Sequence, residues 1–151
     1  MKLKTKLFSV FLITLFLFSC KDYNTIDSIP TNKYYTSEIM PDQYKNAYGK
    51  WRVIGTSGGY TGEGYEKDFD YLILKEKGIF GILRNDSLIA YGKLVLTQIQ
   101  GSIVCKFNPE KSANIELCVD PEKEIKVFNN DTLYLFGPCC DRFNIHLVRV
   151  K

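Results

Sequence analysis

From Trp51 to the end of the chain, short β-rich runs alternate with turn residues, and this pattern restricts the possible folds more than any other feature. We expect strands over residues 50–56, 69–74, 79–84, 88–99, 103–107, 115–119, 125–128, 132–136 and 143–150. No run has the length or the periodicity of a helix of about ten residues. Consecutive runs joined by short turns indicate hairpins. The sequence therefore predicts an all-β fold, an up-and-down antiparallel barrel of about eight strands.

Three local signals add detail to this barrel. Asn129-Asn130-Asp131 predicts a tight turn, because asparagine tolerates positive φ. Gly92 predicts a bend in the long run 88–99. Residues 108–114 include a proline and are polar, so we expect them to form a loop between two strands.

One run is apolar on both of its faces. Within residues 132–136, Leu133 and Leu135 alternate with Tyr134 and Phe136. A strand places alternate side chains on opposite faces, so one pair points into the barrel and the other points out. We expect the outer pair to be covered by the N-terminal segment or by a partner.

The start of the chain predicts export. Three lysines precede an almost wholly apolar run over residues 7–18. This run is shorter than the roughly 20 residues of a membrane span but suits a secretory signal peptide. It ends in Leu17-Phe18-Ser19-Cys20, which resembles the bacterial lipobox. The resemblance implies cleavage before Cys20 and attachment of lipid to its thiol. The alternative is an ordinary signal peptide with a chance cysteine.

These signals divide the chain into three parts. Residues 1–19 are expected to be the signal peptide, and residues 20–48 a lipidated cysteine and tether with a short closing turn. Residues 49–151 are expected to form the barrel domain. Acyl chains contribute about 0.8 kcal/mol per buried methylene, so two or three of them hold a protein on a bilayer. The expected location is the cell envelope, lipid-anchored in the outer membrane.

The charge balance gives no sign of a nucleic-acid partner. The formal net charge of +3 comes from Lys2, Lys4 and Lys6 in the expected signal peptide. Without them the chain carries 17 acidic residues and an equal number of basic ones. A nucleic-acid-binding domain normally concentrates positive charge, so no such role is expected.

Several short stretches resemble one protein family. They are the strand with Trp51, the loop 57–62, residues 131–133, residues 139–143 and residues 148–150. Together they resemble the lipocalin-like lipoproteins of Bacteroidetes. This resemblance implies a calycin-type barrel of eight strands. It also implies that Arg149 packs across the Trp51 ring next to Gly49, as a cation–π contact.

The aromatic residues suggest a binding role. We expect the barrel interior to hold a small hydrophobic ligand, with a lid formed by the glycine-rich loop 57–64. The candidate ligand-binding residues are Trp51, Tyr60, Phe69, Tyr71, Tyr91 and Phe143. The alternative is a filled barrel that docks other envelope proteins or inhibits a protease through its loops. A packed interior with an exposed aromatic patch around Tyr134 and Phe136 would favour this alternative.

The cysteines allow several arrangements. Besides Cys20 there are four, at positions 105, 118, 139 and 140, and four cysteines permit three pairings. Cys105 and Cys118 are the best candidate disulfide if they lie on neighbouring strands. For Cys139 and Cys140 we expect a structural turn with one buried and one exposed thiol. Tetrahedral zinc needs three or four Cys or His ligands, and the chain has one histidine and no CxxC spacing, so no metal or cofactor is expected.

No motif predicts catalysis, and we expect the protein not to be an enzyme. The glycine-rich loop is not followed by Lys-Ser/Thr or by a helix, so it is neither a P-loop nor a dinucleotide fingerprint. His146 is expected to face solvent on its strand. Ser57 and Asp141 are its candidate partners, but their spacing does not assemble a triad. An acidic stretch, Glu63, Glu66, Asp68 and Asp70, is expected to be a solvated edge rather than a calcium site.

Overall fold

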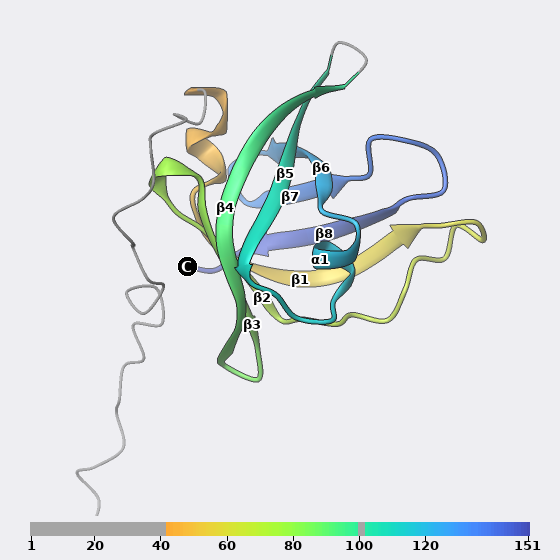
Figure 1. Cartoon of the computed structure of the whole chain (residues 1–151), viewed down its shortest axis with the longest axis horizontal. Coiled ribbons are helices and arrows are strands. Elements are labelled where there is room, and N and C mark those ends of the chain that lie inside the picture. The colour runs from red at the N-terminus through yellow and green to blue at the C-terminus, as the bar shows by residue number, and fades with distance from the viewer. Residues whose placement is uncertain (1–41, 100–101) are drawn as a thin grey trace, which may run out of the picture.

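The computed structural model describes residues 42–99 and 102–151, and these form a closed barrel of antiparallel strands (Figure 1). Each strand pairs with the next, and β8 pairs with β1. The strands are β1 (Gly49–Gly58), β2 (Tyr71–Leu74), β3 (Ile79–Arg84), β4 (Ser87–Ile99), β5 (Ser102–Lys111), β6 (Glu122–Phe128), β7 (Thr132–Phe136) and β8 (Phe143–Arg149). The predicted all-β, up-and-down barrel of about eight strands is confirmed.

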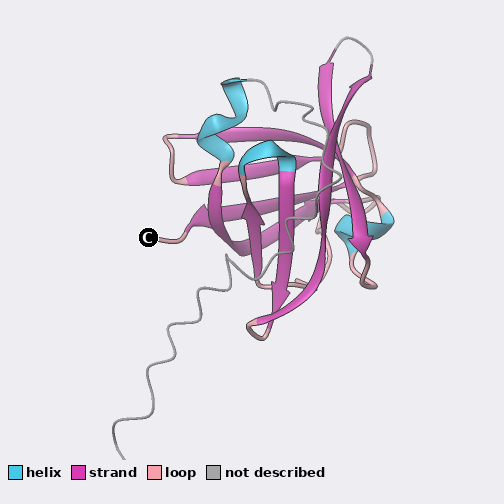
Figure 2. Cartoon of the chain, turned by 60° about the vertical axis from the view of Figure 1, so that its left-hand side comes forward, coloured by secondary structure: helices cyan, strands magenta, loops and turns pink. Residues whose placement is uncertain are grey.

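Three short helical segments accompany the strands. They are η1 (Asp42–Ala47), η2 (Glu76–Gly78) and α1 (Glu116–Val119). The 3-10 helices η1 and η2 lie near one another, and α1 stands apart from them (Figure 2). In the part of the chain that the structure describes, no helix is both long and apolar enough to cross a bilayer.

Two hairpin turns follow directly from their residues. Asn85 and Asp86 join β3 to β4 with φ of 50° and 56°. Asn129 and Asn130 begin the β6–β7 turn with φ of 50° and 59°, and the Asp131 N–H donates to the carbonyl of Phe128 at 3.2 Å. Positive φ at both central residues matches the twist of the flanking strands. The tight turn predicted at residues 129–131 is confirmed.

The predicted strand over residues 115–119 is wrong. The chain forms α1 there, where the Asp120 N–H donates to the Glu116 carbonyl at 2.8 Å. Ile115 and Leu117 are both buried, and their separation by two residues fits an inward-facing strand equally well. Apolar spacing over so short a run cannot distinguish the two structures.

Part of the expected loop 108–114 belongs to a strand. β5 continues to Lys111, and Gly92 pairs with Pro109 where the register of the β4–β5 pairing shifts. A proline is tolerated in a sheet at such an irregularity because no ladder donor is lost there. A Cβ at Gly92 would collide with the carbonyl oxygen of Asn108, so a glycine permits the two backbones to approach. A register shift therefore lies at Gly92, where we expected a bend.

The end of the barrel at which β1 begins is closed by η1. The Trp51 side chain is fully buried, and its Nε1–H donates to the carbonyl of Ala47 at 2.7 Å. The guanidinium carbon of Arg149 lies 4.2 Å from the Trp51 ring centroid. Tyr44 and Ala47 of η1 are also buried. The segment η1 lies within the stretch where we expected a short closing turn, and the expected cation–π contact of Arg149 with Trp51 is present.

Side chains from every strand fill the barrel. The inward-facing residues form one cluster, in which Phe80 and Phe107 meet edge to face with centroids 5.0 Å apart. Phe69, Ile115 and Leu117 belong to the same cluster and close the other end of the barrel. The glycine-rich loop does not close it, because this loop projects from the barrel end (Figure 1) and its Tyr60 is 95% exposed.

Candidate functional site

The structure does not bring the six candidate ligand-binding residues together. Trp51 and Phe69 are buried in the core. Tyr71 and Tyr91 pack on the outer face of the sheet against a small cluster of Ile73, Ile79 and Leu83. The other two lie elsewhere, since the Phe143 ring meets Tyr65 edge to face at 5.0 Å and Tyr60 extends into solvent. No shared interior pocket arises from these placements.

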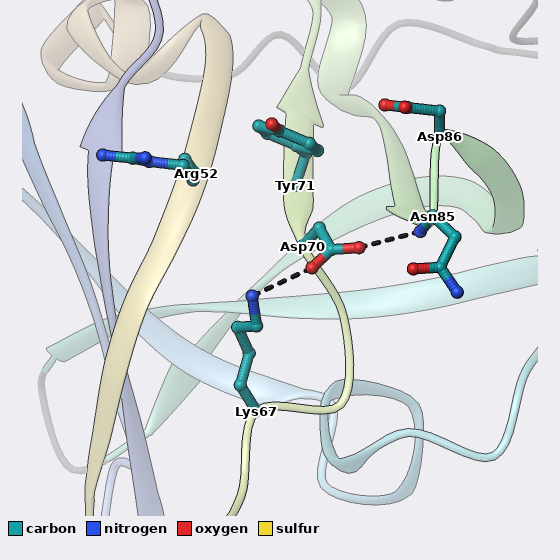
Figure 3. Close-up of a pocket in the computed structure, with 6 residues that line it drawn as sticks. All are labelled: Arg52, Lys67, Asp70, Tyr71, Asn85 and Asp86. Atoms are coloured by element: carbon teal, nitrogen blue, oxygen red, sulfur yellow. Dashed lines mark hydrogen bonds and ion pairs between the residues drawn. The ribbon is translucent and has the colours of Figure 1, made fainter.

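A surface pocket of about 250 Å³ lies outside the barrel (Figure 3). It is lined by Arg52, Lys67, Asp70, Tyr71, Asn85 and Asp86. Asp70 accepts the backbone N–H of Asn85 at 2.8 Å and the Lys67 ammonium at 2.9 Å. These bonds, the backbone one first, hold the pKa of the Asp70 carboxyl below its usual value.

The charges around this pocket do not converge. Figure 3 shows the Arg52 side chain extending away from the Tyr71 ring, while Asp86 points across the pocket toward it. The Lys67 ammonium pairs with the Asp70 carboxylate. Only Tyr71 is shared with the six candidate ligand residues. The pocket is open and polar, and it does not have the largely apolar lining of a typical small-molecule site.

An aromatic surface lies on the outside of β6, β7 and β8. The Tyr134 ring stacks on Phe136 with centroids 5.4 Å apart and an interplanar angle of 10°. It also meets Phe128 at 5.3 Å and His146 at 4.8 Å, both edge to face. Tyr134 alternates with the fully buried residues of β7, so all four rings point outward.

Apolar side chains continue this surface onto β1. The register of the β1–β8 pairing shifts between Val53 and Gly55, which leaves Ile54 at an irregularity with its side chain 55% exposed. The neighbouring β8 residues are His146 and Val148. We name the combined surface the outer aromatic face, comprising Ile54, Phe128, Tyr134, Phe136, His146 and Val148.

Two cations lie beside the outer aromatic face. The Lys126 ammonium sits 5.1 Å from the Phe136 ring centroid and pairs with Glu124 at 3.2 Å. Arg52 pairs with Val148 across the strands and is exposed. Among residues 42–99 and 102–151, no side chain or carbonyl binds the Arg52 guanidinium.

His146 contacts one of its two candidate partners. The Ser57 Oγ lies 3.0 Å from His146 Nε2, and the Asn144 amide reaches the same Oγ at 3.5 Å. Within the described ranges no carboxylate binds the ring, so Asp141 is not a third member. The Gly58 and Gly59 N–H groups donate to the carbonyls of Gly62 and Arg142. The two backbone amides that follow Ser57 in the sequence are therefore occupied, unlike the free donors of an oxyanion hole.

A partly buried ionic cluster lies near α1. Lys123 is fully buried, and its ammonium binds Asp120 at 2.5 Å. Asp120 also accepts the Arg142 guanidinium at 2.8 Å. Burial raises the pKa of the nearby Glu116 carboxyl. The sequence Glu122-Lys123-Glu124 resembles a solvated edge. Only the two-residue spacing between Lys123 and the buried Ile125 could have indicated that Lys123 points inward.

Asp68, which belongs to the expected solvated acidic edge, is half-buried. Asp68 Oδ2 accepts the backbone N–H of Glu116 at 2.5 Å. Within the described residues, Asp68 Oδ1 and the Tyr65 hydroxyl are buried without a hydrogen-bond partner. Burial raises the pKa of the Tyr65 hydroxyl above its ordinary value. Asp68 therefore supports α1 rather than facing solvent, which corrects the expectation for this residue.

The four described cysteines are free thiols. The expected Cys105–Cys118 disulfide is absent, and its premise is wrong because Cys118 lies in α1 rather than on a strand beside Cys105. Burial raises the pKa of the Cys105 thiol to about 12. Cys139 and Cys140 are both exposed, so the expectation of one buried and one exposed thiol is also wrong. No group of three or more metal-binding side chains occurs within the described ranges.

Comparison with known proteins adds no family to this description. No protein-family model, curated protein or solved structure matches the chain. The fold and its surface define the class: an eight-stranded antiparallel barrel with a packed interior and an aromatic outer face.

Proposed function

We propose that this chain is an envelope lipoprotein, held on the outer membrane by lipid on Cys20, whose solid barrel docks a protein partner through the outer aromatic face. One observation carries the docking role: three outward-pointing rings gather around the Tyr134 ring over β6 to β8 while the barrel interior is filled. The contact of Trp51 with Arg149 supports the lipocalin-like resemblance. The proposal includes no catalytic step and no cofactor.

The packed interior favours a protein partner over a small ligand inside the barrel. Trp51, Phe80 and Phe107 are each at most 1% exposed and belong to one contact cluster. A ligand inside the barrel would have to displace such side chains. Displacement is costly, because a close-packed core responds to a volume change of even one methylene. A partner that binds the outer face of the barrel displaces no core side chain.

The outer aromatic face has the composition of an interface core. Aromatic residues are enriched at protein interfaces, and Tyr residues frequently dominate the binding energy. Phe128 is 47% exposed and Ile54 is 55% exposed, so apolar area is available for burial. The exposed Arg52 guanidinium, which has no partner among residues 42–99 and 102–151, lies at the edge of the face, where an acidic group on a partner would complement its charge. We therefore propose a partner with an apolar centre and carboxylates at its rim.

Site-directed crosslinking tests the docking role. A photo-crosslinking amino acid placed at Phe128 in the native envelope should give one discrete conjugate, and the same group at Tyr60 should not. Ile54→Ser should weaken this conjugate, because it removes apolar contact area. Val119→Ser is the matched control, since Val119 is 69% exposed on α1 outside the face. A conjugate formed only from position 60 would contradict the proposal and favour docking through the loop.

Labelling with a palmitate analogue tests the anchor separately. The intact chain should incorporate the label and sediment with membranes, whereas Cys20→Ala should do neither. An unlabelled intact chain would contradict the lipoprotein part of the proposal. It would leave the crosslinking result to decide the docking part.

A further inference from the structure

Two exposed thiols lie side by side at one end of the barrel. Cys139 Sγ and Cys140 Sγ are 3.7 Å apart in the β7–β8 turn, and both residues are exposed. The other two described cysteines differ from them. Cys105 is fully buried with a raised pKa, and Cys118 is half-buried in α1. Of the described cysteines, only Cys139 and Cys140 therefore combine accessibility with a neighbouring sulfur.

The turn that carries the two thiols is fixed at both ends. The Gly137 N–H donates to Asn144 Oδ1 at 3.0 Å, and a Cβ at Gly137 would collide with Arg142. Arg142 binds Asp120 at 2.8 Å and Glu122 at 3.5 Å, and its carbonyl accepts the Gly59 N–H. Because both ends of the turn are held, little freedom remains to be lost when the thiols bind one ion.

The separation of the two sulfurs suits one metal ion. Thiolates bind tetrahedral Zn²⁺ at about 2.3 Å, which places two sulfurs of one ion roughly 3.8 Å apart. The observed distance of 3.7 Å between the two sulfurs matches this separation, so the turn need not move. We propose that Cys139 and Cys140 together bind a soft, thiophilic metal ion of the zinc and cadmium class.

The chain supplies two ligands to this ion. No third His, Cys, Asp or Glu joins them into a larger group in residues 42–99 and 102–151. Water or an added ligand completes the coordination, so the ion exchanges with solvent. Two thiolates select soft ions over calcium and magnesium, which require oxygen ligands. Binding replaces two thiol protons with one divalent ion, and affinity therefore rises with pH.

Cadmium titration of the reduced protein tests this site. Full-length chain carrying Cys20→Ser is used in detergent, so that position 20 adds no thiol. Native mass spectrometry should show one Cd²⁺ bound with the loss of two protons. Thiolate-to-cadmium absorption should rise in parallel and saturate at one equivalent.

Three variants assign the ligands. Cys139→Ser and Cys140→Ser should each weaken Cd²⁺ binding at least tenfold, and Cys118→Ser should leave it unchanged. All three should unfold at the same temperature as the parent if the exposed thiols have no structural role. The proposal is overturned if either turn variant keeps the parent affinity. It is equally overturned if the parent binds Cd²⁺ no more tightly than the double variant Cys139→Ser/Cys140→Ser.

Discussion

Arg149 of the last strand, β8, packs on the Trp51 ring of β1 and also contacts the segment before β1. Its guanidinium carbon lies 4.2 Å from the ring centroid. The same guanidinium donates to the carbonyls of Tyr48 at 2.7 Å, Asn46 at 2.6 Å and Asn130 at 2.5 Å. One side chain therefore holds η1, the β6–β7 turn and the indole in a fixed arrangement at this end of the barrel.

Arg149→Ala should destabilise the protein by about 2–3 kcal/mol, because hydrogen bonds to a charged donor and a cation–π contact are lost together. Arg149→Lys should recover only part of this, since lysine keeps the charge but not the planar fork. Arg52→Ala is the matched control. The Arg52 guanidinium has no partner in the described part of the chain, so its loss should change the free energy of unfolding by less than about 0.5 kcal/mol. Urea unfolding of the three variants measures these differences.

The barrel and one end of it could be predicted from sequence for identifiable reasons. Strand runs separated by turn residues define hairpins locally, and the Asn129–Asp131 turn needs no information from elsewhere in the chain. The Arg149–Trp51 contact was predictable from a resemblance that joins both ends of the domain. The chain order of an up-and-down barrel then follows from the hairpins alone.

Features that depend on three-dimensional neighbours could not be predicted. Ser57 and His146 meet at 3.0 Å although 89 positions separate them, because an irregularity at Ile54 sets the β1–β8 register. Cys139 is exposed in a turn whose far end is held by the ion pair of Arg142 with Asp120. Lys123 points inward only because β6 is in the register that buries Ile125. The spacing of Lys123 from Ile125 was the one local sign among these, and no local pattern contains the Ser57–His146 contact or the exposure of Cys139.

Removing Asp120 and removing its buried partner Lys123 should have unequal effects on stability. Asp120→Ala leaves the fully buried Lys123 ammonium without its carboxylate, which should cost about 3–5 kcal/mol. Lys123→Met should cost much less, because Asp120 keeps its 2.8 Å contact with Arg142 and the new side chain is apolar. Comparing the free energies of unfolding measures this asymmetry. Equal losses for the two variants would contradict it.

Tyr65→Phe should leave stability unchanged or raise it by up to about 1 kcal/mol, because it removes a buried hydroxyl without a partner while keeping the ring. The edge-to-face contact with Phe143 at 5.0 Å does not involve that hydroxyl. Thr56→Val is the contrasting variant. Thr56 Oγ1 accepts the Tyr65 N–H at 2.9 Å and donates to the Tyr65 carbonyl, so its loss should destabilise the protein. Thermal unfolding of both variants distinguishes the two roles.

The Asp70 carboxylate should make stability depend on acid pH. Its pKa in the folded protein lies below the ordinary 3.8, so the folded state binds this proton less readily than the unfolded state. The contribution is complete above the ordinary pKa and is lost as pH falls through the lowered value. Asp70→Asn should therefore flatten the acid decline in the free energy of unfolding. Asp86→Asn, which removes a carboxylate from the same pocket, should leave the decline in place.

A cavity made in the core separates a solid barrel from one that holds a ligand. Phe80→Ala should cost about 3–5 kcal/mol, because the ring is fully buried against Phe107. Phe128→Ala is the control, since its ring lies on the outer face and its truncation leaves no interior void. An apolar fluorescent probe should bind the folded Phe80→Ala variant but neither the parent nor the control. Stoichiometric probe binding by the parent, lost in Phe80→Ala, would instead show that the parent interior accepts a ligand.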